Sequence, residues 1–235
     1  TLPKVGADPA KTVFVSGIGC SSRISGYVDF HSLHTLHGRA LAFATGVKLS
    51  KPSLNVIVPM GDGDALAIGG NHFIHAARRN INITALVMNN RTYGMTGGQF
   101  SPLSGVGTKA TTAPYMNIDR EFDTVELASA AGATFVARTT VYHVKQLQSM
   151  LEKAIKHDGF SVLEVLTQCP TYFGRKNRKG SAVDMMNNYR DTTVPIGSDK
   201  KKENPELIER GIFVDKNLPE YCQAYAELVE RATTK

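Results

Sequence analysis

Continuous apolar runs alternate along the chain with segments in which apolar residues recur every three or four positions. The runs, rich in β-branched residues, cover 13–15, 54–58, 83–88, 133–136 and 161–166. Runs of this kind are typical of strands buried on both faces. The segments between them, at 39–49, 65–79, 124–131 and 144–156, have helical character, most plainly the last. The pattern therefore predicts a regular alternation of strands and helices.

This alternation predicts an α/β fold with a mainly parallel sheet and helices on both faces. Ligands of such folds bind beyond the carboxyl ends of the strands. The chain becomes more polar after Thr171. We expect residues 1–190 to form one domain and residues 191–235 an arm that packs on it or on a partner subunit, with a loop or docking arm rather than core at 191–204 and a closing helix at 220–231.

Composition narrows the class of protein. With 235 residues, 42% of them hydrophobic, the chain can bury one sizeable core. It contains no apolar run long enough for a membrane span and no leader-like start, so we expect a cytoplasmic protein. Three widely spaced cysteines argue against a disulfide framework. The net charge of +6 suits acidic partners, but neither a lysine-containing phosphate loop nor a nucleic-acid-binding motif is present.

Two polar motifs follow neighbouring strands of the expected sheet. Gly61, Asp62 and Gly63 come directly after the second run, and Asn89 and Asn90 end the third. Either motif alone is most often a simple turn. Together they lie at one edge of a parallel sheet, where a carboxylate and an amide oxygen can hold a divalent cation beside a diphosphate.

The spacing of these motifs is similar to that of the thiamine-diphosphate fold. More specifically, the chain resembles the 2-oxoacid:ferredoxin oxidoreductase family over nearly its whole length. The resemblance rests on motifs that arrive in the family's order, at residues 17–23, 34–39, 61–72, 89–90, 93–99 and 167–170.

The resemblance assigns roles to individual residues. It implies that Mg²⁺ is held by Asp62, the side chain of Asn90 and the backbone oxygen of Thr92. It also implies a thiamine diphosphate site formed by Ile18, Gly19, Cys20, Ser21, His37, Gly63, Asp64, Gly94 and Met95. Asp64 could equally serve as a helix cap.

Two cysteines match the family's iron–sulfur ligands. Cys20 and Cys169 correspond to two of the four thiolates that hold a [4Fe–4S] cluster, whereas Cys222 matches nothing in the pattern. The family's other pair, a Cys-x-x-Cys, lies upstream of Thr1. We favour a sequence recorded without its first segment over a variant in which a separate polypeptide supplies the pair. Without the resemblance, both cysteines would be interpreted as buried thiols.

Three further side chains are candidates for catalysis or substrate binding. Arg23 could form a bidentate pair with a substrate carboxylate, a role that its position and the resemblance favour over that of a plain surface arginine. His37 and His72 would lie near the cofactor. His72 and His75 stand three apart, but no third ligand completes a zinc site.

The resemblance implies oxidative decarboxylation of a 2-oxoacid to acyl-CoA and CO₂, with electrons passing through the cluster to ferredoxin. An alpha subunit would supply an essential glutamate. We expect 2-oxoglutarate as the substrate rather than pyruvate. The basic segment 175–179 is a candidate contact for ferredoxin or for the phosphates of coenzyme A. The alternatives are a non-oxidative thiamine-diphosphate decarboxylase subunit and, least favoured, a basic nucleic-acid-binding module.

Overall fold

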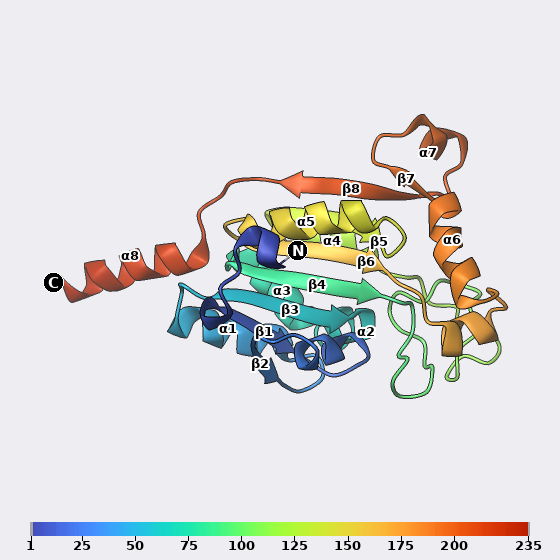
Figure 1. Cartoon of the computed structure of the whole chain (residues 1–235), viewed down its shortest axis with the longest axis horizontal. Coiled ribbons are helices and arrows are strands. Elements are labelled where there is room, and N and C mark those ends of the chain that lie inside the picture. Colours follow the sequence, from blue (N-terminus) through green and yellow to red (C-terminus); the bar gives the residue numbers. More distant parts are fainter. Residues whose placement is uncertain (1, 235) are drawn as a thin grey trace.

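The computed structural model describes residues 2–234 and contains one eight-stranded sheet. The strands are β1 (Thr12–Ser16), β2 (His31–His34), β3 (Asn55–Gly61), β4 (Ile83–Asn89), β5 (Phe135–Thr140), β6 (Phe160–Leu166), β7 (Thr193–Pro195) and β8 (Ile208–Asp215). Their order in space is β2-β1-β3-β4-β6-β5-β8-β7 (Figure 1). Only the pair β5 and β8 is antiparallel. The expected α/β fold with a mainly parallel sheet is confirmed.

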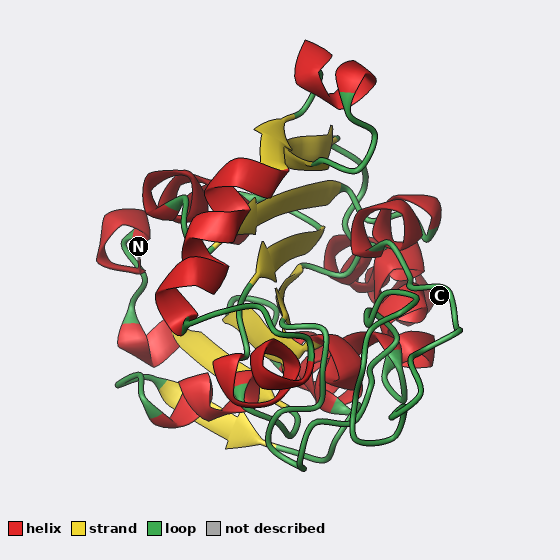
Figure 2. Ribbon diagram, turned by 90° about the vertical axis from the view of Figure 1, so that its right-hand side faces the viewer, coloured by secondary structure: helices red, strands yellow, loops and turns green. Residues whose placement is uncertain are grey.

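Helices cover both faces of this sheet (Figure 2). The α-helices are α1 (Ala40–Ser50), α2 (Asp62–Leu66), α3 (Gly70–Arg79), α4 (Thr124–Ala130), α5 (Val144–Lys156), α6 (Ala182–Thr192), α7 (Asp199–Glu203) and α8 (Tyr221–Thr233). Short 3₁₀ or π turns are η1 (Leu2–Val5), η2 (Pro9–Lys11), η3 (Ser21–Gly26) and η4 (Pro170–Gly174).

The core has two parts because side chains alternate across the buried strands. On one face, α1, α3 and α4 pack against the sheet, and Phe160 and Val162 of β6 point into this cluster. On the other face, α5 packs against Leu163 and Val165 of the same strand. Unbroken apolar runs are therefore needed here, which is why the sequence pattern located β6 within one residue.

Some expected elements differ from the structure. The expected helix 65–79 is broken between α2 and α3, where the chain makes a tight turn. The turn is so tight that a methyl group at Gly69 would lie 2.2 Å from the backbone oxygen of Asp64. The segment 191–204, expected to be a loop or docking arm rather than core, is not a loop: it contains the end of α6, then β7 and α7, and Thr193 and Val194 are buried. The strand expected at 133–136 begins two residues later and continues to Thr140.

The C-terminal segment extends the sheet and then leaves it. β8 pairs with β5, and α8 projects from the body of the protein (Figure 1). The helix expected at 220–231 is confirmed as α8. None of the helices within residues 2–234 is both long and apolar enough to cross a membrane.

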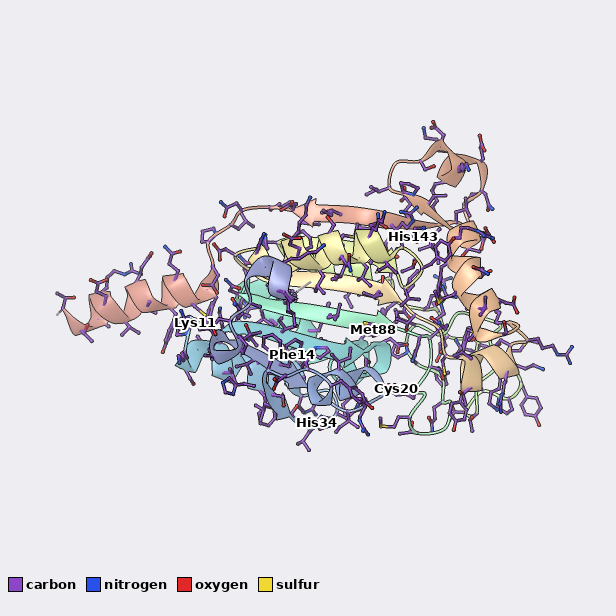
Figure 3. The ribbon with its side chains drawn as sticks, in the orientation of Figure 1. Lys11, Phe14, Cys20, His34, Met88 and His143 are labelled. Atoms are coloured by element: carbon purple, nitrogen blue, oxygen red, sulfur yellow. The ribbon has the colours of Figure 1, made fainter. Side chains whose placement is uncertain are left out.

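The carboxyl ends of β1, β3, β4 and β6 lie at the same edge of the sheet, as their parallel pairing requires. The segments that leave this edge begin at residues 17, 62, 90 and 167, and the second of them is helix α2. Cys20 lies toward the same end of the molecule as Met88, near the end of β4 (Figure 3). The polar motifs of the sequence therefore converge on one edge.

Candidate functional site

Asp62 is a buried carboxylate at the junction of β3 and α2. Its side chain is 2% exposed, and its Oδ2 accepts a hydrogen bond of 2.5 Å from the hydroxyl of Ser101. Burial raises the pKa of Asp62 to about 7, against the lowering effect of the Ser101 and Gly63 hydrogen bonds. Burying an ionised carboxylate costs free energy unless a cation or further hydrogen-bond donors compensate its charge.

The residues after β4 form a tight turn, Asn90–Thr92, at the same edge of the sheet as Asp62. Arg91 adopts the left-handed conformation, with φ of 60°. The side-chain oxygen of Asn90 accepts the backbone N–H of Thr92 at 3.2 Å. The hydroxyl of Thr92 donates to the carbonyl oxygen of Gln99 at 2.8 Å. The carbonyl oxygen of Thr92 receives no hydrogen bond from residues 2–234, so it remains available to a ligand.

Asp64 and His37 form a second polar pair. Oδ1 of Asp64 accepts the N–H of Gly38 at 2.6 Å and lies 3.0 Å from Nδ1 of His37. The same nitrogen lies 3.1 Å from the carbonyl oxygen of Ile18. Because the carbonyl oxygen of Ile18 and the ionised carboxylate of Asp64 are both acceptors, they favour a proton on Nδ1. Burial raises the pKa of Asp64, although Gly38 and His37 oppose the shift.

Asp64 also has an oxygen without a protein partner. Its Oδ2 is fully buried and makes no hydrogen bond within the described residues. A buried acceptor of this kind normally has a donor. We expect a ligand to provide it, since the other oxygen of the same carboxylate is already held by Gly38.

Gly17 permits this arrangement by its lack of a side chain. A methyl group there would lie 2.4 Å from Oδ2 of Asp64. Gly17→Ala is therefore expected to lower the free energy of unfolding by about 1–3 kcal/mol and to displace the carboxylate. Gly46→Ala is the matched control: Gly46 is an exposed residue of α1 with open space around it, and its replacement should stabilise by about 0.4–1 kcal/mol. Denaturant titration measures the free energy of unfolding of both variants, and equal changes would contradict the predicted clash between a side chain at residue 17 and Asp64.

Cys20 and Cys169 lie together although 149 residues separate them in the sequence. A methyl group at Gly94 would be 3.1 Å from Sγ of Cys20 and 3.6 Å from Sγ of Cys169. Burial, then the neighbouring Cys169, raises the pKa of the Cys20 thiol. Cys222 is buried in α8 beside Lys48 and Glu220, away from this pair. No group of three or more His, Cys, Asp or Glu side chains within residues 2–234 could hold a metal ion.

The structure does not bring every expected residue into hydrogen-bonding contact with this cluster. Arg23 is exposed on η3, where its guanidinium lies 6.0 Å from the ring centre of Tyr27. His72 is half-buried on α3, and its pKa is lowered by burial and by the nearby Arg39 and His75. Met95 is about half exposed beside the cysteines, and its backbone amide lowers the pKa of Cys20. The roles of Arg23 and His72 stay predictions.

A cavity of about 370 Å³ opens next to Asp62. Its wall contains Ser101 and Tyr93, which also contact the segment of Asp62 and Gly63, and its rim contains Arg120. A cavity of this size, lined by both apolar and polar side chains, suits a small organic ligand.

Comparisons with known proteins agree with this geometry. Residues 17–165 match the family model of the thiamine pyrophosphate enzyme, C-terminal TPP binding domain. A 2-oxoglutarate synthase subunit KorB of Methanothermobacter marburgensis is 51% identical over the whole chain and 83% of that relative. The corresponding subunit of Archaeoglobus fulgidus is 48% identical over 96% of the chain and 82% of its own length.

A solved structure resembles the whole fold. The 2-oxoglutarate:ferredoxin oxidoreductase of Magnetococcus marinus, solved with 2-oxoglutarate, coenzyme A and succinyl-CoA bound, superposes with a TM-score of 0.89. It is 34% identical, and the match covers 99% of this chain and 81% of that one. The chain belongs to the 2-oxoacid:ferredoxin oxidoreductase family. The resemblance drawn from the sequence motifs is thereby confirmed, and thiamine diphosphate is the cofactor of this domain.

The oxygen atoms at the site suit the magnesium that a 2-oxoacid:ferredoxin oxidoreductase would use with its diphosphate. Asp62 offers a carboxylate, Asn90 an amide oxygen and Thr92 a carbonyl oxygen that no described residue hydrogen-bonds, and these are hard donors of the type Mg²⁺ prefers. An iron–sulfur cluster fits only in part. Cys20 and Cys169 are close enough to share one, but they supply two of the usual four thiolates.

Several residues of the site escaped the sequence motifs. Ser101 and Ser104 lie in the long segment between β4 and α4, and they connect Asp62 to the Arg91 turn. Gly38 lies within the motif at residues 34–39 but was given no role there; its backbone N–H donates to Asp64. The only sequence signal for the two serines was their polar character within a stretch that also contains Pro102 and Leu103.

Proposed function

We propose that the chain is the thiamine-diphosphate-binding beta subunit of an enzyme that converts 2-oxoglutarate and coenzyme A into succinyl-CoA and CO₂. Electrons would pass through a [4Fe–4S] cluster to ferredoxin, and an alpha subunit would complete the active site. The observation that carries this proposal is the convergence of Asp62, the Asn90–Thr92 turn and the Cys20–Cys169 pair at one edge of the sheet.

The residues of this chain would bind and orient the reactants. Asp62, Asn90 and Thr92 would hold Mg²⁺ against the diphosphate, and the backbone at Gly63, Gly94 and Met95 would line the cofactor. Bound thiamine diphosphate supplies the nucleophilic carbon and the electron sink of the reaction. Asp64 and Ile18 favour a proton on Nδ1 of His37, and Nε2 would then be free to accept a hydrogen bond or a proton.

The redox part of the proposal rests on the cysteines. Cys20 and Cys169 flank Gly94, which follows the metal-binding turn by two residues. A cluster held here would be close to the cofactor, as electron transfer requires. Its remaining thiolates would come from outside the described residues.

A partner subunit is supported by the surface around the cavity. Tyr115 and Ile118 are 95% and 86% exposed, and Phe122, which lines the cavity, is about half exposed. Apolar side chains that gather on one loop commonly mark a surface that another protein covers. We propose that the alpha subunit covers this loop.

The substrate can be tested with the purified alpha–beta complex. Viologen reduction that depends on coenzyme A should proceed with a kcat/KM at least about tenfold higher for 2-oxoglutarate than for pyruvate. A site that pairs with the second carboxylate of 2-oxoglutarate has a group left unpaired when pyruvate binds. A preference for pyruvate would contradict the substrate assignment. Release of CO₂ without viologen reduction would instead support the non-oxidative decarboxylase.

The basic segment 175–179 offers a contact for an acidic electron acceptor. It follows η4, which begins next to Cys169, and Asn177 fastens it to Lys109 through hydrogen bonds of 2.8 and 3.0 Å. Arg175, Lys176, Arg178 and Lys179 are exposed, and none of them forms an ion pair within the described residues.

Reversing charge in this segment is expected to slow ferredoxin reduction. Arg175→Glu with Lys179→Glu should lower the ferredoxin-dependent rate by about 10-fold or more at low ionic strength and reduce its salt dependence, while viologen reduction is unchanged. Lys200→Glu with Lys202→Glu, in the exposed basic run of α7, changes the charge equally at another place and should have little effect. A raised KM for coenzyme A would assign the segment to that substrate instead.

A further inference from the structure

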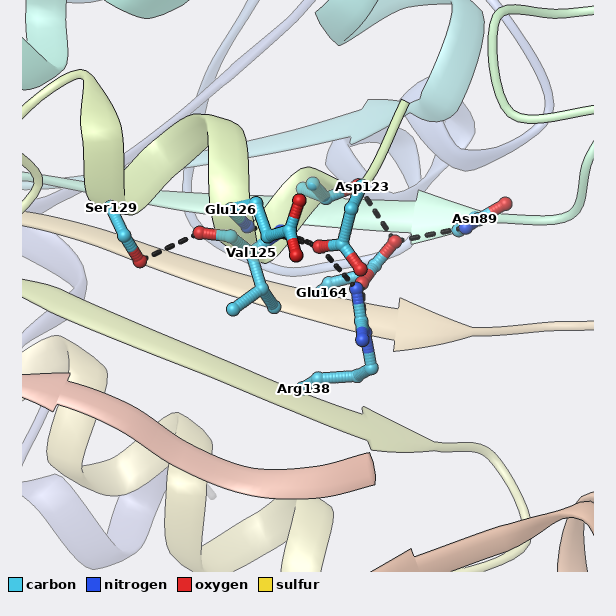
Figure 4. A network of polar contacts seen from close by, with 8 residues as sticks. Asn89, Asp123, Val125, Glu126, Ser129, Arg138 and Glu164 are labelled. Carbon is cyan, nitrogen blue, oxygen red and sulfur yellow. Dashed lines mark hydrogen bonds and ion pairs between the residues drawn. The ribbon is translucent and has the colours of Figure 1, made fainter. Parts of the chain in front are cut away.

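A buried ion network around Glu164 (Figure 4) is connected through Asn89 to the Asn90–Thr92 turn. Glu164 of β6 is 1% exposed, and its Oε2 accepts a hydrogen bond of 2.5 Å from Nε of Arg138 on β5. The guanidinium also pairs with Asp123, at 2.7 Å. Asp123 in turn caps the amino end of α4 by accepting the N–H groups of Val125 and Glu126. The network is therefore anchored in two strands and a helix.

The other oxygen of Glu164 connects this network to the turn. Oε1 accepts the side-chain amide N–H of Asn89 at 2.9 Å. The side-chain oxygen of Asn89 then accepts the backbone N–H of Arg91 at 3.2 Å. One amide group thus joins a buried carboxylate to the residue whose φ is 60°.

The connection continues to Asp62 on the far side of the turn. The carbonyl oxygen of Arg91 accepts the hydroxyl of Ser104 at 2.6 Å. The hydroxyl oxygen of Ser104 accepts the N–H of Ser101 at 2.8 Å, and Ser101 donates to Asp62. The peptide groups on both sides of Arg91 are therefore held, and the same chain of hydrogen bonds joins Asp62 to the turn that contains Asn90 and Thr92.

Two physical arguments point to a role beyond stability. A buried ion pair is often no better for stability than apolar residues of similar volume, so its presence is weak evidence of a stabilising function. A non-glycine residue in the left-handed region is strained and persists only where its surroundings hold it. We propose that Glu164, acting through Asn89, is a positioning residue that sets the Asn90–Thr92 turn for Mg²⁺ binding. The proposal rests on the proposed function of this site.

Paired variants can separate positioning from stability. Asn89→Ala and Thr124→Val each remove one donor to the same oxygen, since the Thr124 hydroxyl also bonds to Oε1 of Glu164, at 2.7 Å. Both residues are buried, but only Asn89 contacts the turn. Glu164→Gln is the third variant, because a single amide oxygen cannot satisfy Asn89, Thr124 and Arg138 together.

The measurement is calorimetric titration of Mg²⁺ into the cofactor-stripped alpha–beta complex in the presence of thiamine diphosphate, with melting temperatures alongside. Asn89→Ala is expected to raise the apparent Kd for Mg²⁺ by about 10–100-fold, and Glu164→Gln by about 10-fold. Thr124→Val should stay within about twofold of the wild type despite a similar fall in melting temperature. At saturating Mg²⁺, kcat of the two affected variants should recover to near the wild-type value.

The results that would contradict the positioning role differ from the result that would contradict the magnesium site itself. Equal Mg²⁺ affinities for Asn89→Ala and Thr124→Val would overturn the proposal, as would a Glu164→Gln complex that binds Mg²⁺ like the wild type. If Glu164→Gln does not fold, the comparison of Asn89→Ala with Thr124→Val still decides whether the turn is positioned. A wild-type complex that binds thiamine diphosphate without any divalent cation would overturn the magnesium site itself, and with it the positioning role.

Discussion

Asp62→Asn is expected to lower the affinity of the assembled enzyme for Mg²⁺ by at least about 100-fold and to reduce turnover to a small fraction of the wild-type rate. The substitution keeps the size of the side chain and an acceptor for Ser101, but it removes the only carboxylate among the three expected ligand groups. Mg²⁺ titration of thiamine diphosphate binding and steady-state kinetics measure the two effects.

A matched variant separates this effect from general damage. Asp119→Asn changes an exposed carboxylate on the rim of the neighbouring cavity and should leave Mg²⁺ affinity unchanged. In the metal-free protein, Asp62→Asn should melt at or above the wild-type temperature, because it removes a buried charge. An Asp62→Asn enzyme with normal Mg²⁺ affinity would show that the cation binds elsewhere.

Cys20→Ser is expected to have the second-largest effect, on electron transfer rather than on cofactor binding. Loss of one of the two thiolates beside Gly94 should remove most of the iron and lower ferredoxin and viologen reduction by at least about 100-fold. Thiamine diphosphate binding should persist, because the oxygen ligands of Asp62, Asn90 and Thr92 are unchanged. Iron analysis and absorbance near 400 nm of the anaerobically purified complex would measure the cluster.

Cys222→Ala is the control for this experiment. Cys222 is buried in α8 and contacts the core cluster that α1 and α3 share. The complex that carries Cys222→Ala should therefore retain its full iron content. Iron content that is equal in Cys20→Ser, Cys169→Ser and the wild type would exclude a cluster at this pair.

The sequence located the central strands and the edge at which the ligands gather, because both depend on local patterns. Buried parallel strands need unbroken apolar runs, which are visible at β3, β4 and β6. β8 was missed, since Ile208–Asp215 mixes charged residues with Gly211 and is only partly buried. All four residues of β2 are exposed, and they are His, Ser, Leu and His, so no apolar run marks the strand.

The site could be predicted only where a motif and a strand end coincide. Parallel pairing of β3 with β4 brings Gly61 opposite Met88, one residue before Asn89, and the spacing of the two motifs was enough to foresee that. Ser101 and Ser104 reach Asp62 through a long irregular segment whose path no periodicity encodes. Glu164 did carry a signal: a single charged residue inside an apolar run must be paired, and Arg138 is the one charge in β5.

The most direct test of the central claim is a crystal structure of the alpha–beta complex with thiamine diphosphate and Mn²⁺ in place of Mg²⁺, with anomalous scattering recorded for manganese. We predict a peak within bonding distance of the Asp62 carboxylate, the side-chain oxygen of Asn90 and the carbonyl oxygen of Thr92, with the diphosphate beside it. A diphosphate bound at another edge of the sheet, or a manganese peak that avoids these three oxygens, would contradict the account.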